Sequence, residues 1–291
     1  MIRFVIGTVV GVMAILFFLG CDAKLPTSTV GESSNTKGAG SIFSANAPID
    51  SIGIYHGVIC DSVSKNEAYN TGQSFAWNVR NLSNRAHYYL KVKYNYDTSD
   101  IPRWVQDTII AKETAWYSTP VRTLFPDYHA VALGKTCWDS LCPADKAFAD
   151  SLTYYFTNLN VSGYTWQQIA SQVTSKASSL LTAVNGASFT GPLAGECAKG
   201  IVQIMGNSAS LWGYKIGNTS NDDPRRTAAV FVWLVQADAA GYIAGWVNAS
   251  RIEITETGHL DPANAEKRIK AGLDGAIQAS SLGFLNLGMF D

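Results

Sequence analysis

The sequence predicts a mainly α-helical bundle built around one apolar helix. Apolar residues recur at helical spacing along most of the chain, and polar capping residues precede several of these stretches. One stretch, residues 228–249, is apolar on nearly every side, which is typical of a helix at the centre of a bundle. The hydrophobic fraction of 47% supplies enough side chains for a core and excludes a chain that is disordered throughout.

The charge of the chain is nearly balanced. It has 22 Lys and Arg residues against 23 Asp and Glu residues, and a formal net charge of −1 at pH 7. A nucleic-acid-binding protein needs a basic surface that neutralises phosphates. We therefore expect no nucleic-acid partner.

The first twenty residues are typical of an export signal. Arg3 precedes an apolar run from Phe4 to Leu19, and a short basic start before such a run marks a secretory signal peptide. Cys21 follows the run directly after Gly20, as in a bacterial lipobox, where the cysteine is lipidated and becomes the new N-terminus. The alternatives are an uncleaved membrane anchor or an ordinary signal followed by an incidental cysteine.

The segment after Cys21 has the composition of a tether. Residues 21–47 are rich in Ser, Thr, Asn, Gly and Ala, and such a segment buries too little apolar surface to offset the entropy lost on ordering. We expect a signal peptide over residues 1–20, a flexible tether over 21–47 and a single helical domain over 48–291. The protein would then be exported to the cell envelope and held at a membrane by its lipid, in a leaflet that the sequence leaves open.

The cysteine count agrees with export. Five cysteines are present, so four remain if Cys21 carries lipid, and an even number in an exported protein fits two disulfides. We favour a bond between Cys137 and Cys142, which bracket a short loop, and this leaves Cys60 with Cys197. The alternatives are buried free thiols or a metal site, but the spacing of the pair and the absence of a nearby His in the sequence disfavour zinc.

Helical periodicity places apolar stripes along the predicted domain. Ile52, His56, Ile59 and Val63 share one face of a helix that starts near Pro48. Similar stripes predict helices that begin near residue 102 and at Pro143, and further helices from residue 165 onward.

Helix ends are marked by capping residues. Thr165 and Gln168 form a capping-box pattern, and Gly186 is expected to end the helix that follows. Two Asp-Pro pairs, Asp223-Pro224 and Asp261-Pro262, each place an N-cap residue before a proline suited to the first helical position. We expect a helix to start at each of these pairs.

One segment has the period of a strand instead. Leu90, Val92, Tyr94 and Tyr96 alternate with polar residues, and this period of two predicts a short strand or hairpin beside the helices.

The apolar helix over residues 228–249 carries an acid, Asp238, near its middle. A carboxylate at that depth in a bilayer costs at least ~2.5 kcal/mol, which favours a central helix of a soluble bundle over a membrane span. In a bundle, Asp238 would be buried and hydrogen-bonded. Gly241 and Gly245 are spaced so that another backbone can approach closely, and the C-terminal helix offers a matching face of small residues at Ala271, Gly275 and Ala279.

Several short motifs resemble one known group. Residues 50–56 match a D-x-x-G-x-x-H start, residues 208–212 match a Ser-plus-aromatic motif, and residues 237–245 and 270–281 match a glycine-rich C-terminal part. Together these motifs resemble a group of uncharacterised secreted proteins and lipoproteins of Bacteroidetes-type bacteria, although Gly57 stands where that group usually has Asn. The resemblance implies export and fold, and it implies no activity. The glycine-rich part is also similar in texture to bacteriocin-like peptides.

No catalytic motif accompanies these features. The sequence contains no H-E-x-x-H and no P-loop, and Ser208 lies in a run that falls short of G-x-S-x-G. We therefore assign no catalytic residue, no metal ligand and no cofactor, and we lean against an enzyme.

His56 and Asp238 are the two side chains that we single out as functional candidates, because both are expected in the core, where burial shifts a pKa. A structural role is favoured for each. The sequence thus supports a lipid-anchored envelope protein with a helical binding or structural domain and an unidentified envelope partner. The alternative is a membrane-active protein that inserts its 228–249 helix.

Overall fold

The computed structural model describes residues 51–67, 70, 72–94, 151–152, 154–156, 158–186, 195–219 and 226–287. These residues form helices and short connections, so the prediction of a mainly α-helical bundle is confirmed, and within these ranges no strand occurs. All of them belong to one unit, Ser41–Asp291. The predicted signal, Cys21, the tether, Cys137 and Cys142 lie outside the described residues, as does the helix predicted from residue 102.

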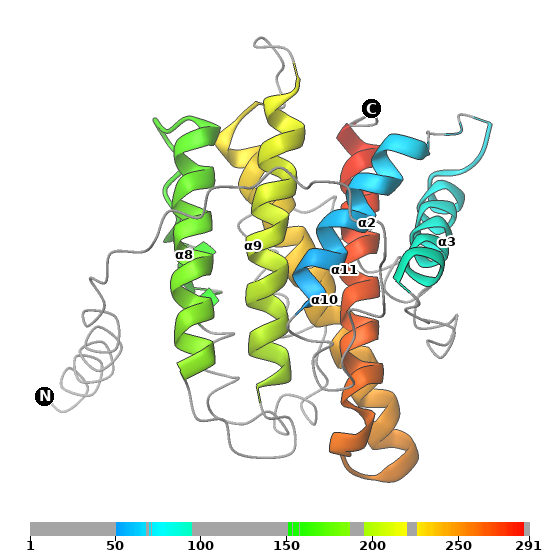
Figure 1. The fold of residues 1–291 in the computed structure, drawn as a ribbon. Helices are drawn as coiled ribbons and strands as arrows, with labels where there is room; N and C mark the ends of the chain where they lie inside the picture. The colour runs from blue at the N-terminus through cyan, green and yellow to red at the C-terminus, as the bar shows by residue number, and fades with distance from the viewer. Residues whose placement is uncertain are drawn as a thin grey trace, which may run out of the picture. The chain divides into compact units, whose positions relative to one another are not determined.

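Within the described ranges, the helices with defined bounds are α2 Ile52–Asn66, α3 Phe75–Tyr94, α8 Trp166–Gly186, α9 Glu196–Gly217, α10 Ala228–Thr257 and α11 Ala265–Leu287, together with the 3₁₀ turn η2 Pro262–Asn264 (Figure 1). The long apolar helix α10 packs against α8, α9 and α11. Its residues from Leu234 to Val247 are all buried, which confirms the central position expected for an all-apolar helix.

Glycines let α10 and α11 pack with their backbones almost in contact. A Cβ atom on Gly245 would lie 1.8 Å from the carbonyl oxygen of Ala271, and one on Gly275 would lie 2.0 Å from the carbonyl oxygen of Gly241. No side chain fits at either distance, so only glycine is compatible with this antiparallel pairing. The small-residue interface predicted from the spacing of Gly241 and Gly245 is therefore confirmed.

The predicted helix ends are partly confirmed. The capping box that opens α8 is formed, with Gln168 N donating to Thr165 Oγ1 at 3.3 Å and Thr165 N donating to Gln168 Oε1 at 2.8 Å, and α8 ends at Gly186. Asp261 caps η2 by accepting a hydrogen bond from Ala263 N.

The expected start of α10 at Pro224 is wrong. Arg226 and Thr227 are not helical, and α10 begins at Ala228 because the side chain of Thr227 accepts a hydrogen bond from Val230 N. A threonine immediately before the apolar run thus provides the N-cap.

The strand predicted near Leu90 is also wrong, since α3 continues as a helix to Tyr94. Val79, Leu82, Ala86 and Leu90 are all buried, and their spacing of three and four residues is that of a helix. Val92, which the alternating pattern placed with Leu90, is 63% exposed. The alternation was a local coincidence at the end of a helical stripe.

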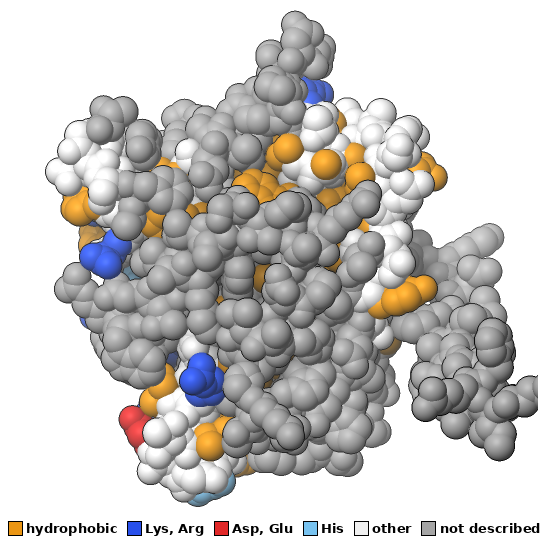
Figure 2. Space-filling model, turned by 180° about the vertical axis from the view of Figure 1, so that it is seen from behind, with side chains coloured by type: hydrophobic (Ala, Val, Ile, Leu, Met, Phe, Trp, Pro, Cys, Tyr) orange, Lys and Arg blue, Asp and Glu red, His pale blue; other side chains and the backbone are white. Residues whose placement is uncertain are grey.

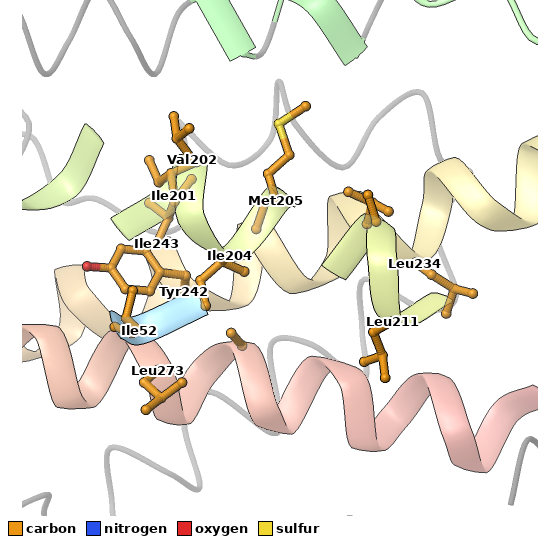
Figure 3. Close-up of a cluster of buried hydrophobic side chains, with 14 of the residues drawn as sticks. Ile52, Ile201, Val202, Ile204, Met205, Leu211, Leu234, Tyr242, Ile243 and Leu273 are labelled. Carbon is orange, nitrogen blue, oxygen red and sulfur yellow. The ribbon is translucent and has the colours of Figure 1, made fainter. Parts of the chain in front are cut away.

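The core is continuous across the helices. Ile52 of α2, Leu273 of α11 and Tyr242 of α10 meet apolar side chains of α9 in one cluster (Figure 3). Each fully buried aliphatic or aromatic side chain of this kind stabilises the fold by ~1.5–3 kcal/mol relative to exposure. The predicted stripe of α2, from Ile52 through Ile59 to Val63, faces this core.

Candidate functional site

Polar side chains from two neighbouring helices hydrogen-bond to Asp238 in the middle of α10. Ser208 Oγ and Trp212 Nε1, one turn apart on α9, donate to Asp238 Oδ2 at 2.6 and 2.7 Å. Ser280 Oγ of α11 donates to Asp238 Oδ1 at 2.7 Å. The expectation that Asp238 is buried and hydrogen-bonded is thus confirmed, with three donors on one carboxyl group.

His56 of α2 completes this group, which we call the Asp238 cluster: His56, Ser208, Trp212, Asp238 and Ser280. His56 Nε2 lies 3.0 Å from Ser280 Oγ and 3.6 Å from Asp238 Oδ2. All five residues are fully buried. The two functional candidates named from the sequence therefore belong to one site.

Burial acts in opposite directions on the two titratable groups. It raises the pKa of Asp238 to about 7, while the hydrogen bonds from Ser208, Ser280 and Trp212 partly offset the rise. It lowers the pKa of His56 to about 4, and the backbone of Ala276 opposes this shift. Between these two values the neutral forms of both side chains are favoured.

The close approach of α2 to α9 brings His56 to the cluster. A Cβ atom on Gly53 would lie 2.5 Å from the carbonyl oxygen of Gln203, so a side chain there would force the two helices apart. His56 follows on the same buried face of α2. Residues from three of the motifs noted in the sequence thus lie close together. His56 belongs to the D-x-x-G-x-x-H start, which also supplies Gly53. Ser208 and Trp212 belong to the Ser-plus-aromatic motif, and Ser280 belongs to the glycine-rich part.

The arrangement is not that of a hydrolase triad. In such a triad the imidazole lies between the serine and the carboxylate and takes the serine proton. Here the Ser280 hydroxyl lies between the two, 2.7 Å from Asp238 Oδ1 and 3.0 Å from His56 Nε2. Because the cluster is fully buried, its side chains serve the packing of α2, α9 and α11 around α10.

Cys60 lies beside the cluster, and its buried thiol, like that of Cys197, is not part of a disulfide. Burial and the nearby charge of Asp238 raise the pKa of the Cys60 thiol far above its ordinary value, against a hydrogen bond from Ser280. The thiol is therefore unreactive, because the thiolate is the nucleophile.

The expected disulfide between Cys60 and Cys197 is not formed. Cys60 lies next to Asp61, which pairs with Lys215 near the end of α9. Cys197 lies in the first turn of α9, and at 1.5 Å per residue the helix separates it from Lys215 by about 27 Å. A disulfide needs Cα atoms within ~7 Å. Cys60 and Cys197 lie beside opposite ends of α9, so they cannot form one.

A second buried group joins three helices through one cation, and sequence reasoning missed it. Arg268 of α11 donates from Nε and Nη2 to Glu196 of α9 at 3.0 and 2.7 Å, and from Nη1 to Glu253 of α10 at 2.5 Å. Trp246 Nε1 also donates to Glu196. The available signal was the spacing of Arg268 with Ala271 and Gly275, which placed it on the buried face of α11.

The charged forms are favoured within this second group. Burial alone would raise the pKa of Glu253, but hydrogen bonds from Asp261 N, Asn264 and Arg268 bring it below its usual value. Burial lowers the pKa of Arg268, and its two carboxylate partners raise it by more. The group is therefore an ion-pair network that closes the end of the α10–α11 hairpin.

A third polar contact attaches α3 to the bundle. His87 Nε2 contacts Asp274 Oδ1 of α11, and Gln278 Nε2 donates to Asp274 Oδ2 at 2.7 Å. Burial lowers the pKa of His87, but the charge and hydrogen bond of Asp274 raise it overall. The contact fixes α3 on the face of α11.

The comparisons give no relative from which a role could be carried over: no protein-family model, curated protein or solved structure matches this chain. Among the residues that the structure describes, no group of three or more His, Cys, Asp or Glu side chains is placed to hold a metal ion. The interpretation of the site therefore rests on its own geometry.

Proposed function

We propose that this protein is a lipid-anchored protein of the cell envelope whose helical domain acts as a binding or structural module. The observation that carries the proposal is the state of Asp238. This acid interrupts the apolar stretch of α10, and it is buried with three hydrogen-bond donors on its carboxyl group. That environment makes α10 the core of a folded domain, which an N-terminal lipid at Cys21 would hold at a membrane.

The described surface offers contacts for a partner. Aromatic and aliphatic side chains are exposed in several separate places, which Figure 2 shows from one side. They include Trp77, Tyr88, Tyr154, Tyr164 and Tyr214. Tyr and Trp are enriched where proteins bind one another, because they combine a large apolar area with a polar group. The His56, Ser208 and Asp238 side chains, in contrast, are fully buried.

The lipid anchor is tested by fatty-acid labelling in a bacterial host. Wild type should incorporate label and fractionate with membranes, whereas Cys21→Ser should remain an unprocessed precursor without label. Cys60→Ser is the matched control, because it removes a different cysteine and should keep the label. Equal labelling of Cys21→Ser and wild type would contradict the proposal.

A second candidate function is membrane insertion by α10. This helix is long and apolar enough to span a bilayer, although 83% of its most apolar stretch is buried within the bundle. The raised pKa of Asp238, about 7, favours membrane insertion, since a neutral carboxyl group enters lipid at a lower cost than a charged one. Insertion would require α10 to leave its contacts with α8, α9 and α11.

The Asp238→Ala substitution separates the two candidates. In a soluble bundle it leaves Ser208, Trp212 and Ser280 without their shared partner, so the free energy of unfolding should fall by ~1–3 kcal/mol, as measured by thermal or chemical denaturation. In a membrane-inserting protein it removes the main obstacle to insertion, so co-sedimentation with liposomes and leakage of their contents should increase. Chains that start at residue 48 should be used for both measurements, so that the anchor does not contribute. Unchanged stability together with increased leakage would favour the second candidate.

A further inference from the structure

A continuous hydrogen-bonded path joins the acid and the base of the Asp238 cluster. Asp238 Oδ1 lies 2.7 Å from Ser280 Oγ, which lies 3.0 Å from His56 Nε2. A serine hydroxyl has one proton to donate and lone pairs to accept others, so Ser280 can relay a proton in either direction. Asp238 Oδ2 already accepts from Ser208 and Trp212, and a carboxyl proton is therefore placed on Oδ1, next to Ser280.

We infer that Asp238 and His56 share one proton through the Ser280 hydroxyl. In the neutral arrangement the hydrogen bond between Asp238 and Ser280 runs in the direction opposite to that described above: Asp238 Oδ1–H donates to Ser280 Oγ, whose own proton is donated to His56 Nε2, and the imidazole proton is on Nδ1. In the ionic arrangement Ser280 donates to the carboxylate and His56 Nε2–H donates to Ser280. The transfer breaks the Oδ1–H bond and one Oγ–H bond and forms a new Oγ–H bond and an Nε2–H bond, so the cluster keeps the same protons.

The surroundings favour the neutral arrangement. Both side chains are fully buried, and a charged pair would lose its solvation on both sides. The pKa directions agree, because burial raises the pKa of Asp238 to about 7 and lowers that of His56 to about 4. The ring also interacts with the backbone of Ala276, which raises the pKa of His56 by less than burial lowers it.

The charged groups of the neighbouring helices do not replace either partner. Asp61 of α2 pairs with Lys65 of the same helix and lies 3.6 Å from Lys215 of α9. Asp274 of α11 is bound by His87 of α3. Each of these acids thus has its own cation or histidine, and within α10 Asp238 is the acid that meets His56.

The shared proton determines the charge of the cluster at each pH. Between about pH 4 and 7 the folded cluster keeps one proton and carries no net charge. Above pH 7 the proton is lost, and a carboxylate is left in the core between α10, α11 and α2. The helices should therefore pack around a neutral cluster in mild acid and around a charged one above neutrality.

Nitrogen NMR of the histidine rings tests the inference in the full chain, labelled with ¹⁵N-histidine and purified in mild detergent. The chain has four histidines, so the His56 signal is identified as the one that His56→Gln removes. If that variant does not fold, replacement of His87, His129 and His259 by Gln in turn identifies it by elimination. At pH 6 we expect a neutral His56 ring with its proton on Nδ1 and an unprotonated Nε2. A charged ring at pH 6, or a neutral ring protonated on Nε2, would overturn the inference.

Two serine variants test the relay itself. Ser280→Ala removes the hydroxyl between the two groups, so the proton of the neutral His56 ring should move to Nε2, which then faces the carboxyl group directly. Ser208→Ala removes a donor to Asp238 Oδ2, and it should leave the His56 proton on Nδ1. If Ser280→Ala leaves the position of the ring proton unchanged, Ser280 does not connect the two groups.

Discussion

His56 Nε2 of α2 lies 3.6 Å from Asp238 Oδ2 of the central helix α10, and both side chains are fully buried. An isolated buried acid and an isolated buried base would each destabilise a core. Placed together, with Ser280 between them, they need only one proton for both to be neutral. This relationship explains how a nearly apolar helix tolerates Asp238 at its middle, and it sets the pH dependence of the domain.

Wild-type stability should vary little between pH 4 and 6.5 through this cluster. In the unfolded chain His56 titrates near 6.5 and Asp238 near 3.8, so one proton is bound in this window, on His56. In the folded chain one proton is also bound, on Asp238. Stability depends on pH only where the two states bind different numbers of protons, so thermal melting should give a flat profile from these two groups.

Each single variant should break this balance in its own direction. In Asp238→Asn the folded state keeps the lowered pKa of His56, so stability should be full above pH 6.5 and fall as the pH drops toward 4. In His56→Gln the folded state keeps the raised pKa of Asp238, so stability should be highest near pH 4 and fall as the pH rises to 7. Changes of roughly 3–4 kcal/mol are expected. Parallel profiles for both variants would contradict the coupling.

Gly275→Ala should strongly destabilise the α10–α11 pairing. The new Cβ would lie 2.0 Å from the carbonyl oxygen of Gly241, and the helices must separate to accommodate it. We expect a loss of ~1–3 kcal/mol or more in the free energy of unfolding, measured by urea denaturation. Gly186→Ala is the matched control, since a Cβ atom there meets no other atom within 4 Å. Equal stability of the two variants would show that the backbones are not so close.

Arg268→Met should leave two buried carboxylates without their cation. Glu196 and Glu253 would then face each other's charge in the core, and removal of one partner from a buried ion pair typically costs ~3–5 kcal/mol. Lys65→Met removes a solvent-exposed partner of Asp61 and should cost ~0.5 kcal/mol or less. Thermal unfolding of the two variants beside wild type measures the difference, and similar melting temperatures would refute a structural role for the Arg268 group.

The two buried cysteines should react only after unfolding. In the native protein Cys60 and Cys197 should resist iodoacetamide because both are buried, and in urea without reductant both should be alkylated because neither is part of a disulfide. Cys137 and Cys142 are predicted from their spacing to be recovered as one linked peptide under the same conditions. Protection of Cys60 and Cys197 in urea without reductant would mean that they are linked after all.

The sequence by itself determined the features that depend on neighbours along the chain. The capping box of Thr165 and Gln168, the buried stripe of α2 and the apolar character of α10 all follow from residues within one or two helical turns. The pairing of α10 with α11 was also predictable, because Gly245 and Gly275 lie where the two helix backbones come closest and carry no side chain there. Such patterns report which face of a helix is buried.

Only the tertiary structure decided which buried helix faces contact each other and how the helices are positioned along one another. It joined His56 to Asp238 through Ser280, it gave Glu196 and Glu253 the same cation, and it separated Cys60 from Cys197 along α9. It also made α3 a helix where a few alternating residues near Leu90 predicted a strand. Periodicity fixes the direction of a side chain around its own helix, whereas its partner depends on how far one helix slides along another, and that distance is set by packing of the whole core.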